Sequence, residues 1–209
     1  MLNIPSIQQT MSVFVAEELS EVLNTKVVIG RINIGLLNRI IIDDVLLDDQ
    51  SGQEMLKVTR LSAKFDIMPF FKGKISISSV QLFGFNIDLR KETPESPPNF
   101  KFVLDAFASK DTVKKENSLD LRINSILIRR GRMSYHVLSE QETPGKFNAK
   151  HIQLQNIIAN ISLKALSKDS LNLGIKRLSL DEKASGFSLK KMSLKLVANN
   201  KQTNIDNFT

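Results

Sequence analysis

The chain has 209 residues and a formal net charge of +7, with 42% hydrophobic and 24% charged residues. This composition is that of a globular protein, which excludes wholesale disorder. No run of about 18 apolar residues occurs, so we expect no transmembrane helix within these residues. Because cysteine is absent, disulfides and thiolate metal sites are excluded.

In chain order, the sequence predicts a helix, a sheet segment, a linker and a second sheet segment. We expect an amphipathic helix over 5–24, a first β-sheet segment over 26–91, a linker with a short helix over 92–118, and a second β-sheet segment, truncated, over 119–209. The apolar stripe of the first helix consists of Ile7, Met11, Phe14, Val15, Leu19, Val22 and Leu23. Its polar side has no Lys or Arg, which favours packing against a sheet over adsorption to anionic lipid.

The strongest pattern is an eight-residue unit, apolar-x-apolar-x-x-apolar-x-apolar, that occurs eight times. The copies begin at Val27, Ile40, Leu56, Ile75, Leu121, Ile152, Leu173 and Phe187. Two-residue alternation is typical of strands, but the central doublet, which is polar or glycine in every copy, breaks the phase. A β-bulge at the doublet would return all four apolar side chains to one face. The alternative is that some copies are two short strands joined by a bend.

These copies predict a sheet with one apolar and one polar face. Eight copies of four residues make thirty-two apolar side chains, which present on the order of 2,000–4,000 Å². Exposed patches on soluble monomers reach only about 300–600 Å², and the first helix would cover about a tenth of this face. Either a second sheet covers the face, as in a β-sandwich, or a curved antiparallel sheet forms an apolar groove for acyl chains.

The sequence predicts no catalytic residue, no cofactor and no metal site. His136 and His151 are the only histidines, and no carboxylate lies at ligand spacing from them. An enzyme is expected only if the two histidines converge with a carboxylate in a cleft. The densest basic cluster, Arg129–Arg132, is interpreted as a solvated turn rather than a phosphate site. With no Trp and only Tyr135 as tyrosine, the chain lacks the aromatic surface of single-strand binders, so no nucleic acid is expected.

Several segments resemble the N-terminal region of TamB proteins, members of the AsmA-like group, in their Bacteroides-type form. The similar segments are Ile4–Ser6 with the helix that follows, Leu23–Ile34, Ile41–Val45, Lys74–Leu82 and Gly84–Leu89. The alternation at Leu61, Ala63, Phe65 and Ile67 also fits.

The resemblance implies a fold and a function. TamB-like proteins are anchored in the inner membrane of Gram-negative bacteria by one N-terminal helix and extend through the periplasm as a sheet curled into an apolar groove. They work with an outer-membrane barrel partner in outer-membrane protein assembly, and the group is linked to phospholipid movement between the two membranes. The chain lacks the anchor helix and the long remainder of this pattern, so we expect a membrane-proximal fragment whose anchor lies upstream.

On this basis the expected function is non-enzymatic, with phospholipid acyl chains as the ligand. The residues expected to line the groove are Val80, Leu82, Phe83, Phe85, Ile126 and Ile128. The rival hypothesis is a closed β-sandwich that acts as a protein-binding module of the cell envelope and holds no lipid.

Overall fold

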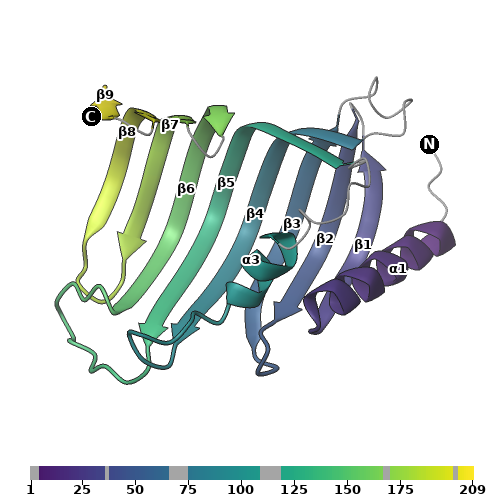
Figure 1. The fold of residues 1–209 in the computed structure, drawn as a ribbon, viewed down its shortest axis with the longest axis horizontal. Coiled ribbons are helices and arrows are strands. Elements are labelled where there is room, and N and C mark those ends of the chain that lie inside the picture. Colours follow the sequence, from purple (N-terminus) through teal and green to yellow (C-terminus); the bar gives the residue numbers. More distant parts are fainter. Residues whose placement is uncertain (1–4, 36–37, 66–74, 109–118, 167–169, 200–201) are drawn as a thin grey trace.

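The computed structural model describes residues 5–35, 38–65, 75–108, 119–166, 170–199 and 202–209. The fold is mainly β, with 62% strand and 13% helix (Figure 1). The elements are α1 (Pro5–Leu23), β1 (Val27–Gly35), β2 (Arg39–Asp48), β3 (Glu54–Phe65), β4 (Ile75–Lys91), α3 (Lys101–Ala108), β5 (Leu119–Val137), β6 (His151–Leu166), β7 (Ser170–Glu182), β8 (Ser188–Asn199) and β9 (Thr203–Asp206).

All nine strands belong to one sheet, in which their order follows the sequence from β1 to β9. Neighbouring strands are antiparallel except β4 and β5, which are parallel. The prediction of a purely antiparallel sheet is therefore wrong at this pair. The reason is the long connection over 92–118, which contains α3 and lets the chain return before β5 begins. The two predicted sheet segments are consequently halves of a single mixed sheet.

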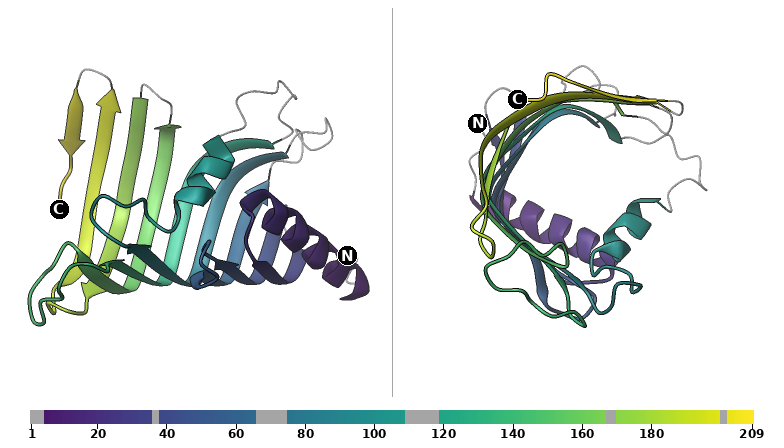
Figure 2. Two further views of the ribbon diagram at one scale, coloured as in Figure 1. Left: turned by 60° about the horizontal axis from the view of Figure 1, so that its bottom comes forward. Right: turned by 90° about the vertical axis from the view of Figure 1, so that its left-hand side faces the viewer.

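The sheet is curved, and it is not closed into a barrel. Seen along the sheet from its β9 end, it bends around the two helices, so that α1 and α3 lie on its concave side (Figure 2). The described residues form one sheet and not two packed sheets, so the β-sandwich alternative is not the fold they adopt. The predicted linker ends in residues 109–118, which lie outside the described part of the chain.

Both predicted helices are present. Helix α1 ends at Leu23 because Asn24 adopts a left-handed conformation with φ 48°. There the backbone N–H of Asn24 donates to the carbonyl of Glu21 (3.2 Å), and that of Thr25 donates to Ser20 (3.1 Å). This pair of bonds is the Schellman motif, which asparagine tolerates better than most residues. Because α1 ends abruptly here, β1 begins only a few residues later, at Val27.

Helix α1 packs on the sheet, as predicted, but its buried stripe differs from the expected one. Leu19 and Leu23 contact the core, and Ser12 is only 1% exposed. Phe14 and Val22, in contrast, are 61% and 47% exposed. At 100° per residue, Phe14 lies about 200° around the helix from Ser12, on the side away from the sheet. The predicted apolar stripe of α1 is therefore too wide, because the hydrophobicity of a residue does not by itself show that it faces the sheet.

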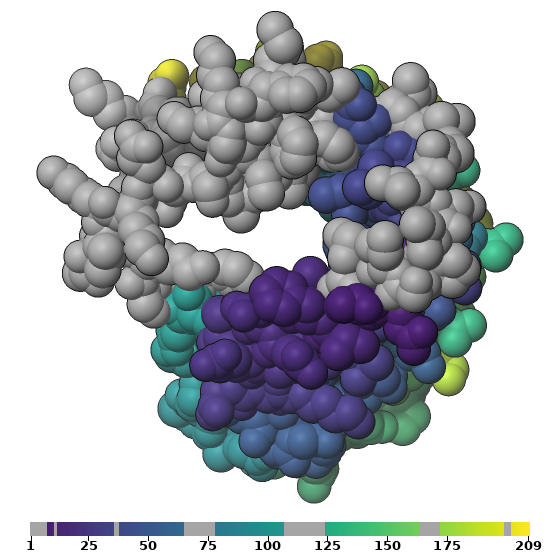
Figure 3. All heavy atoms as spheres, turned by 90° about the vertical axis from the view of Figure 1, so that its right-hand side faces the viewer, coloured from purple at the N-terminus to yellow at the C-terminus, as the bar shows by residue number. Residues whose placement is uncertain are grey.

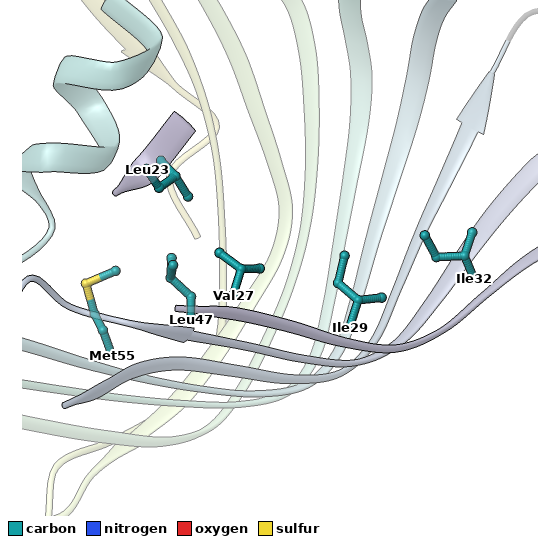
Figure 4. Close-up of a cluster of buried hydrophobic side chains, with 6 residues drawn as sticks. All are labelled: Leu23, Val27, Ile29, Ile32, Leu47 and Met55. Carbon is teal, nitrogen blue, oxygen red and sulfur yellow. The ribbon is translucent and has the colours of Figure 1, made fainter. Parts of the chain in front are cut away.

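The main core lies where α1 and α3 meet the first three strands. Its buried members are Leu23, Val27, Ile29, Ile32, Leu47 and Met55 (Figure 4). Residues of α3, among them Phe102 and Val103, pack against the same cluster. At about 25 cal/mol per Å² of buried apolar area, this cluster is the principal hydrophobic contribution that fixes the helices to the sheet.

Candidate functional site on the inner face of the sheet

The repeated units pair in register in β1, β2 and β3, and apolar residues of the later strands continue the alignment, so that four continuous rows cross the sheet. Row 1 is Val27, Leu47, Leu56, Ile87, Met133 and Leu154; row 2 is Ile29, Val45, Val58, Phe85, Gly131 and Ile157; row 3 is Ile32, Ile42, Leu61, Leu82, Ile128, Ala159, Leu178 and Met192; row 4 is Ile34, Ile40, Ala63, Val80, Ile126, Ile161, Ile175 and Leu194. Directly paired residues share a face. The rows therefore follow the curved sheet from strand to strand.

A line of bends crosses the first five strands between rows 2 and 3. In β1, β2 and β3 the bends fall at the predicted doublets, Gly30–Arg31, Asp43–Asp44 and Thr59–Arg60. In β4 and β5 they fall at Phe83–Gly84 and Arg129–Arg130, and not at the doublets of the copies that begin at Ile75 and Leu121. Left-handed residues occur in three of them, at Asp44 (φ 57°), Gly84 (φ 64°) and Arg130 (φ 55°). In this conformation a single residue reverses the alternation of the strand.

In β1, three of the four apolar residues of the unit return to one buried face, whereas the fourth, Ile34, is exposed. Val27, Ile29 and Ile32 are buried in one cluster, whereas Gly30 and Arg31 are both exposed. The pairing of β1 with β2 continues across the bend without a shift of register, from Ile29 opposite Val45 to Arg31 opposite Asp43. In this pair the two strands therefore bend together, and no unpaired extra residue is inserted. The predicted bulge does occur in later strands, where one extra residue shifts the register at Arg129–Arg130 in β5, Gln155–Asn156 in β6 and Lys176–Arg177 in β7.

The outer side of this bend is polar and basic. Arg60 pairs with Asp43, with 2.6 Å between Nε and Oδ1, and this interaction holds the pKa of Arg60 above its ordinary value. The guanidinium of Arg130 lies 5.1 Å from the centre of the Phe83 ring. The basic cluster Arg129–Arg132 is part of β5, so its interpretation as a turn is wrong. The strand has a left-handed residue, Arg130, at this point.

Helices cover only one end of the inner face. Among the described residues, α1 contacts β1 and α3, and the core that the two helices form involves residues of β1, β2 and β3. The backbone of neither helix comes close to a described strand from β4 to β9. Along rows 3 and 4 from β4 to β8, the side chains are half-buried, except for the buried Ala159. This part of the apolar face therefore lies beyond the backbones of the two helices, and its side chains remain partly exposed.

The structure brings together five of the six predicted lining residues. Leu82 pairs with Ile128 and Val80 pairs with Ile126, in rows 3 and 4. The ring of Phe85 belongs to row 2, where a Cβ atom added to Gly131 would lie 2.4 Å from it.

The sixth residue, Phe83, lies in a bend doublet. Its ring is 38% exposed and is contacted by Arg130. It pairs with Arg60 on one side and Arg129 on the other, and so lies outside the four rows.

Sequence reasoning missed one group of polar residues. His136 and His151 pair directly across β5 and β6, and Glu142 lies beside them in the intervening loop. The expectation that no carboxylate lies at ligand distance is therefore wrong, because the loop folds back over the strand ends. The Glu142 side chain is 64% exposed, so the cluster lies at the surface rather than in an enclosed cleft.

Comparisons with known proteins add no assignment. No protein-family model matches the sequence, and no curated protein matches it significantly. None of the described helices is long and apolar enough to span a membrane. The similarity to TamB-like proteins therefore depends on the sequence segments given above.

Proposed function

We propose that this protein is a non-enzymatic factor of the Gram-negative cell envelope that holds phospholipid acyl chains along the inner face of its curved sheet. In this proposal it is a segment of a TamB-like protein that conveys phospholipid between inner and outer membranes, assists outer-membrane protein assembly, or does both. The observation that carries the proposal is the set of four continuous apolar rows, of which rows 3 and 4 lie beyond the two helices from β4 to β8 and remain half-buried there, except at Ala159.

The dimensions of the rows support an acyl-chain ligand. Rows 3 and 4 cross eight strands, from β1 to β8. Neighbouring strands are about 4.8 Å apart, so seven intervals give a path of roughly 34 Å. The acyl chains of one leaflet occupy about 15 Å, half of a hydrocarbon core of about 30 Å. The rows are therefore about twice as long as the depth that one acyl chain occupies in a bilayer.

The shape of the molecule agrees with this proposal. Viewed from the β1 end, the space-filling surface is hollowed above α1, and α1 forms the floor of the opening (Figure 3). Ile34, at the β1 end of row 4, is 69% exposed.

The energetics suit a protein that passes lipid on. Burying a methylene contributes about 0.8 kcal/mol, and the same gain holds an acyl chain in a bilayer. A chain that moves from bilayer to sheet thus exchanges one apolar environment for a similar one. No residue has to perform chemistry, since continuity of the apolar rows is sufficient.

Photo-crosslinking tests the proposal with a control on the same strand. A photoreactive residue at Leu82, in row 3, should label phospholipid in cells. The same residue at the adjacent Phe83, outside the rows, should not. Labelling of protein alone at Leu82, or equal lipid labelling at both positions, would contradict the proposal and favour the rival function, a protein-binding module whose partner covers the face.

Native mass spectrometry provides a second test on the purified protein. The wild-type chain should retain phospholipid, whereas Ile128→Asp, which places a charge in row 3, should lose most of it. Arg129→Asp changes the adjacent, exposed doublet and should retain it. Circular dichroism of both variants separates loss of lipid from loss of fold.

A further inference from the structure

A second site, independent of the lipid proposal, lies where β5 ends and β6 begins. His136 and His151 are paired across the two strands, and their Nδ1 atoms are 3.1 Å apart. Oε1 of Glu142 lies 4.0 Å from Nδ1 of His136. One potential ligand atom from each residue lies within 4.8 Å of the others. Two imidazoles and a carboxylate therefore converge on one point.

A hydrogen bond to the backbone fixes the orientation of the His151 ring. Its Nε2 lies 2.9 Å from the backbone carbonyl oxygen of Glu140, which can only accept a hydrogen bond. Nε2 must therefore carry the proton, and in the neutral ring Nδ1 keeps its lone pair, which is directed toward His136. A histidine that donates its second nitrogen to a carbonyl is the arrangement usual in metal ligands. His151 is also 8% exposed, so its ring is held in place.

The spacing of the two nitrogens fits a shared cation. The two Nδ1 atoms are 3.1 Å apart. With both metal–nitrogen bonds at about 2.05 Å, this distance gives an N–metal–N angle of roughly 98°. Tetrahedral geometry would need about 3.3 Å, a change of a few tenths of an ångström. Glu142 lies in the exposed loop between the strands, so its carboxylate needs only a small side-chain movement to complete a third bond.

From this geometry we propose that His136, His151 and Glu142 bind a divalent transition-metal ion of the Zn²⁺ class, with water in the remaining position. Imidazole nitrogen with one carboxylate oxygen suits zinc and its neighbours, whereas Mg²⁺ and Ca²⁺ prefer oxygen ligands alone. The bound ion would fasten the loop over 138–150 to the ends of β5 and β6. The site joins two strands through three side chains from separate parts of a hairpin.

Isothermal titration calorimetry of the full chain with ZnCl₂ tests this proposal, after removal of any polyhistidine tag. We expect one Zn²⁺ per chain and an increase in the thermal midpoint with ZnCl₂ that MgCl₂ does not produce. His136→Ala should abolish the binding. Glu142→Gln should weaken it at least about tenfold, since even outer-shell partners contribute about 10–100-fold. Replacement of Zn²⁺ by Co²⁺ should give the visible absorption of a low-coordinate, nitrogen-ligated ion.

The control is Glu140→Gln, which alters a nearby carboxylate that pairs with Lys150 at 2.5 Å and leaves the backbone carbonyl behind His151 in place. This variant should bind Zn²⁺ as the wild type does. Because Glu142 is exposed, its substitution should leave the fold intact even if His136→Ala does not. Wild-type affinity in Glu142→Gln, or equal loss in Glu140→Gln, would overturn the assignment.

Discussion

Gly131 provides the most direct test of the four-row architecture. It is buried, and a Cβ atom at this position would lie 2.4 Å from two atoms of the Phe85 ring and 3.0 Å from Cβ of Ile157. Its φ is not positive, so alanine introduces a collision without backbone strain. Overpacking of this kind costs about 1–3 kcal/mol, partly offset by about 0.4–1 kcal/mol from the stiffer unfolded chain. We expect Gly131→Ala to destabilise the protein by about 1–2 kcal/mol, or roughly 2–8 °C in Tm.

Urea unfolding of a double-mutant cycle with Phe85→Leu would show whether the collision is the cause. The smaller side chain leaves room for the new methyl group, so the double variant should be more stable than the sum of the single changes, by about 0.5–3 kcal/mol. Gly174→Ala is the matched control, since its Cβ would meet only the rotatable hydroxyl of Ser162, at 2.7 Å. Additive effects, or an equal cost at both glycines, would refute the packing of Phe85 over Gly131.

Three further predictions concern single side chains. Burial raises the pKa of Glu182, but hydrogen bonds from Ser185, Gln153 and Ala184 lower it to about 2 from 4.5. The ionised carboxylate then contributes about 1–3 kcal/mol to the free energy of unfolding above pH 4.5, and this contribution is lost as the pH falls toward 2. Glu182→Gln should therefore flatten the dependence of stability on pH between 4.5 and 2, and an unchanged dependence would contradict this. At Asp44, φ 57° should make Asp44→Val cost about 1–2 kcal/mol more than Asp44→Gly in urea unfolding; equal costs would argue against the bend. Ser12→Leu should lower Tm, because the larger side chain overpacks a buried position of α1 at a cost of about 1–3 kcal/mol. Phe14→Leu should leave Tm unchanged, because Phe14 is exposed.

The regular parts of this fold could be predicted because they depend on local pattern. Apolar alternation marked the strands, and the doublets marked the positions where the alternation changes phase, as at Gly30–Arg31. The parallel pairing of β4 with β5 could not be predicted, since it depends on the path of a long connection rather than on the strands themselves. A pattern specifies a strand more reliably than the partner of that strand.

In the candidate sites too, local pattern predicted some residues, whereas long-range pairing decided the others. Leu82 and Ile128 occupy equivalent positions in their strands, and pattern alone predicted that they share a face. Phe83 was included for its hydrophobicity, but it falls in a bend doublet that the eight-residue pattern had not located in β4. The convergence of His136 and His151 depends on the register of a hairpin with a thirteen-residue loop over 138–150, which no local spacing reveals.

The free edge at β9 has a consequence for how much this architecture can hold. In a closed barrel, the interior is set by the number of strands and their tilt, so capacity is fixed when the last strand meets the first. Here β9 pairs on one side only, with β8. Every strand added at such an edge would extend the apolar surface by about 4.8 Å and leave its width unchanged. For the proposed function, capacity would therefore be a length, proportional to the number of repeats.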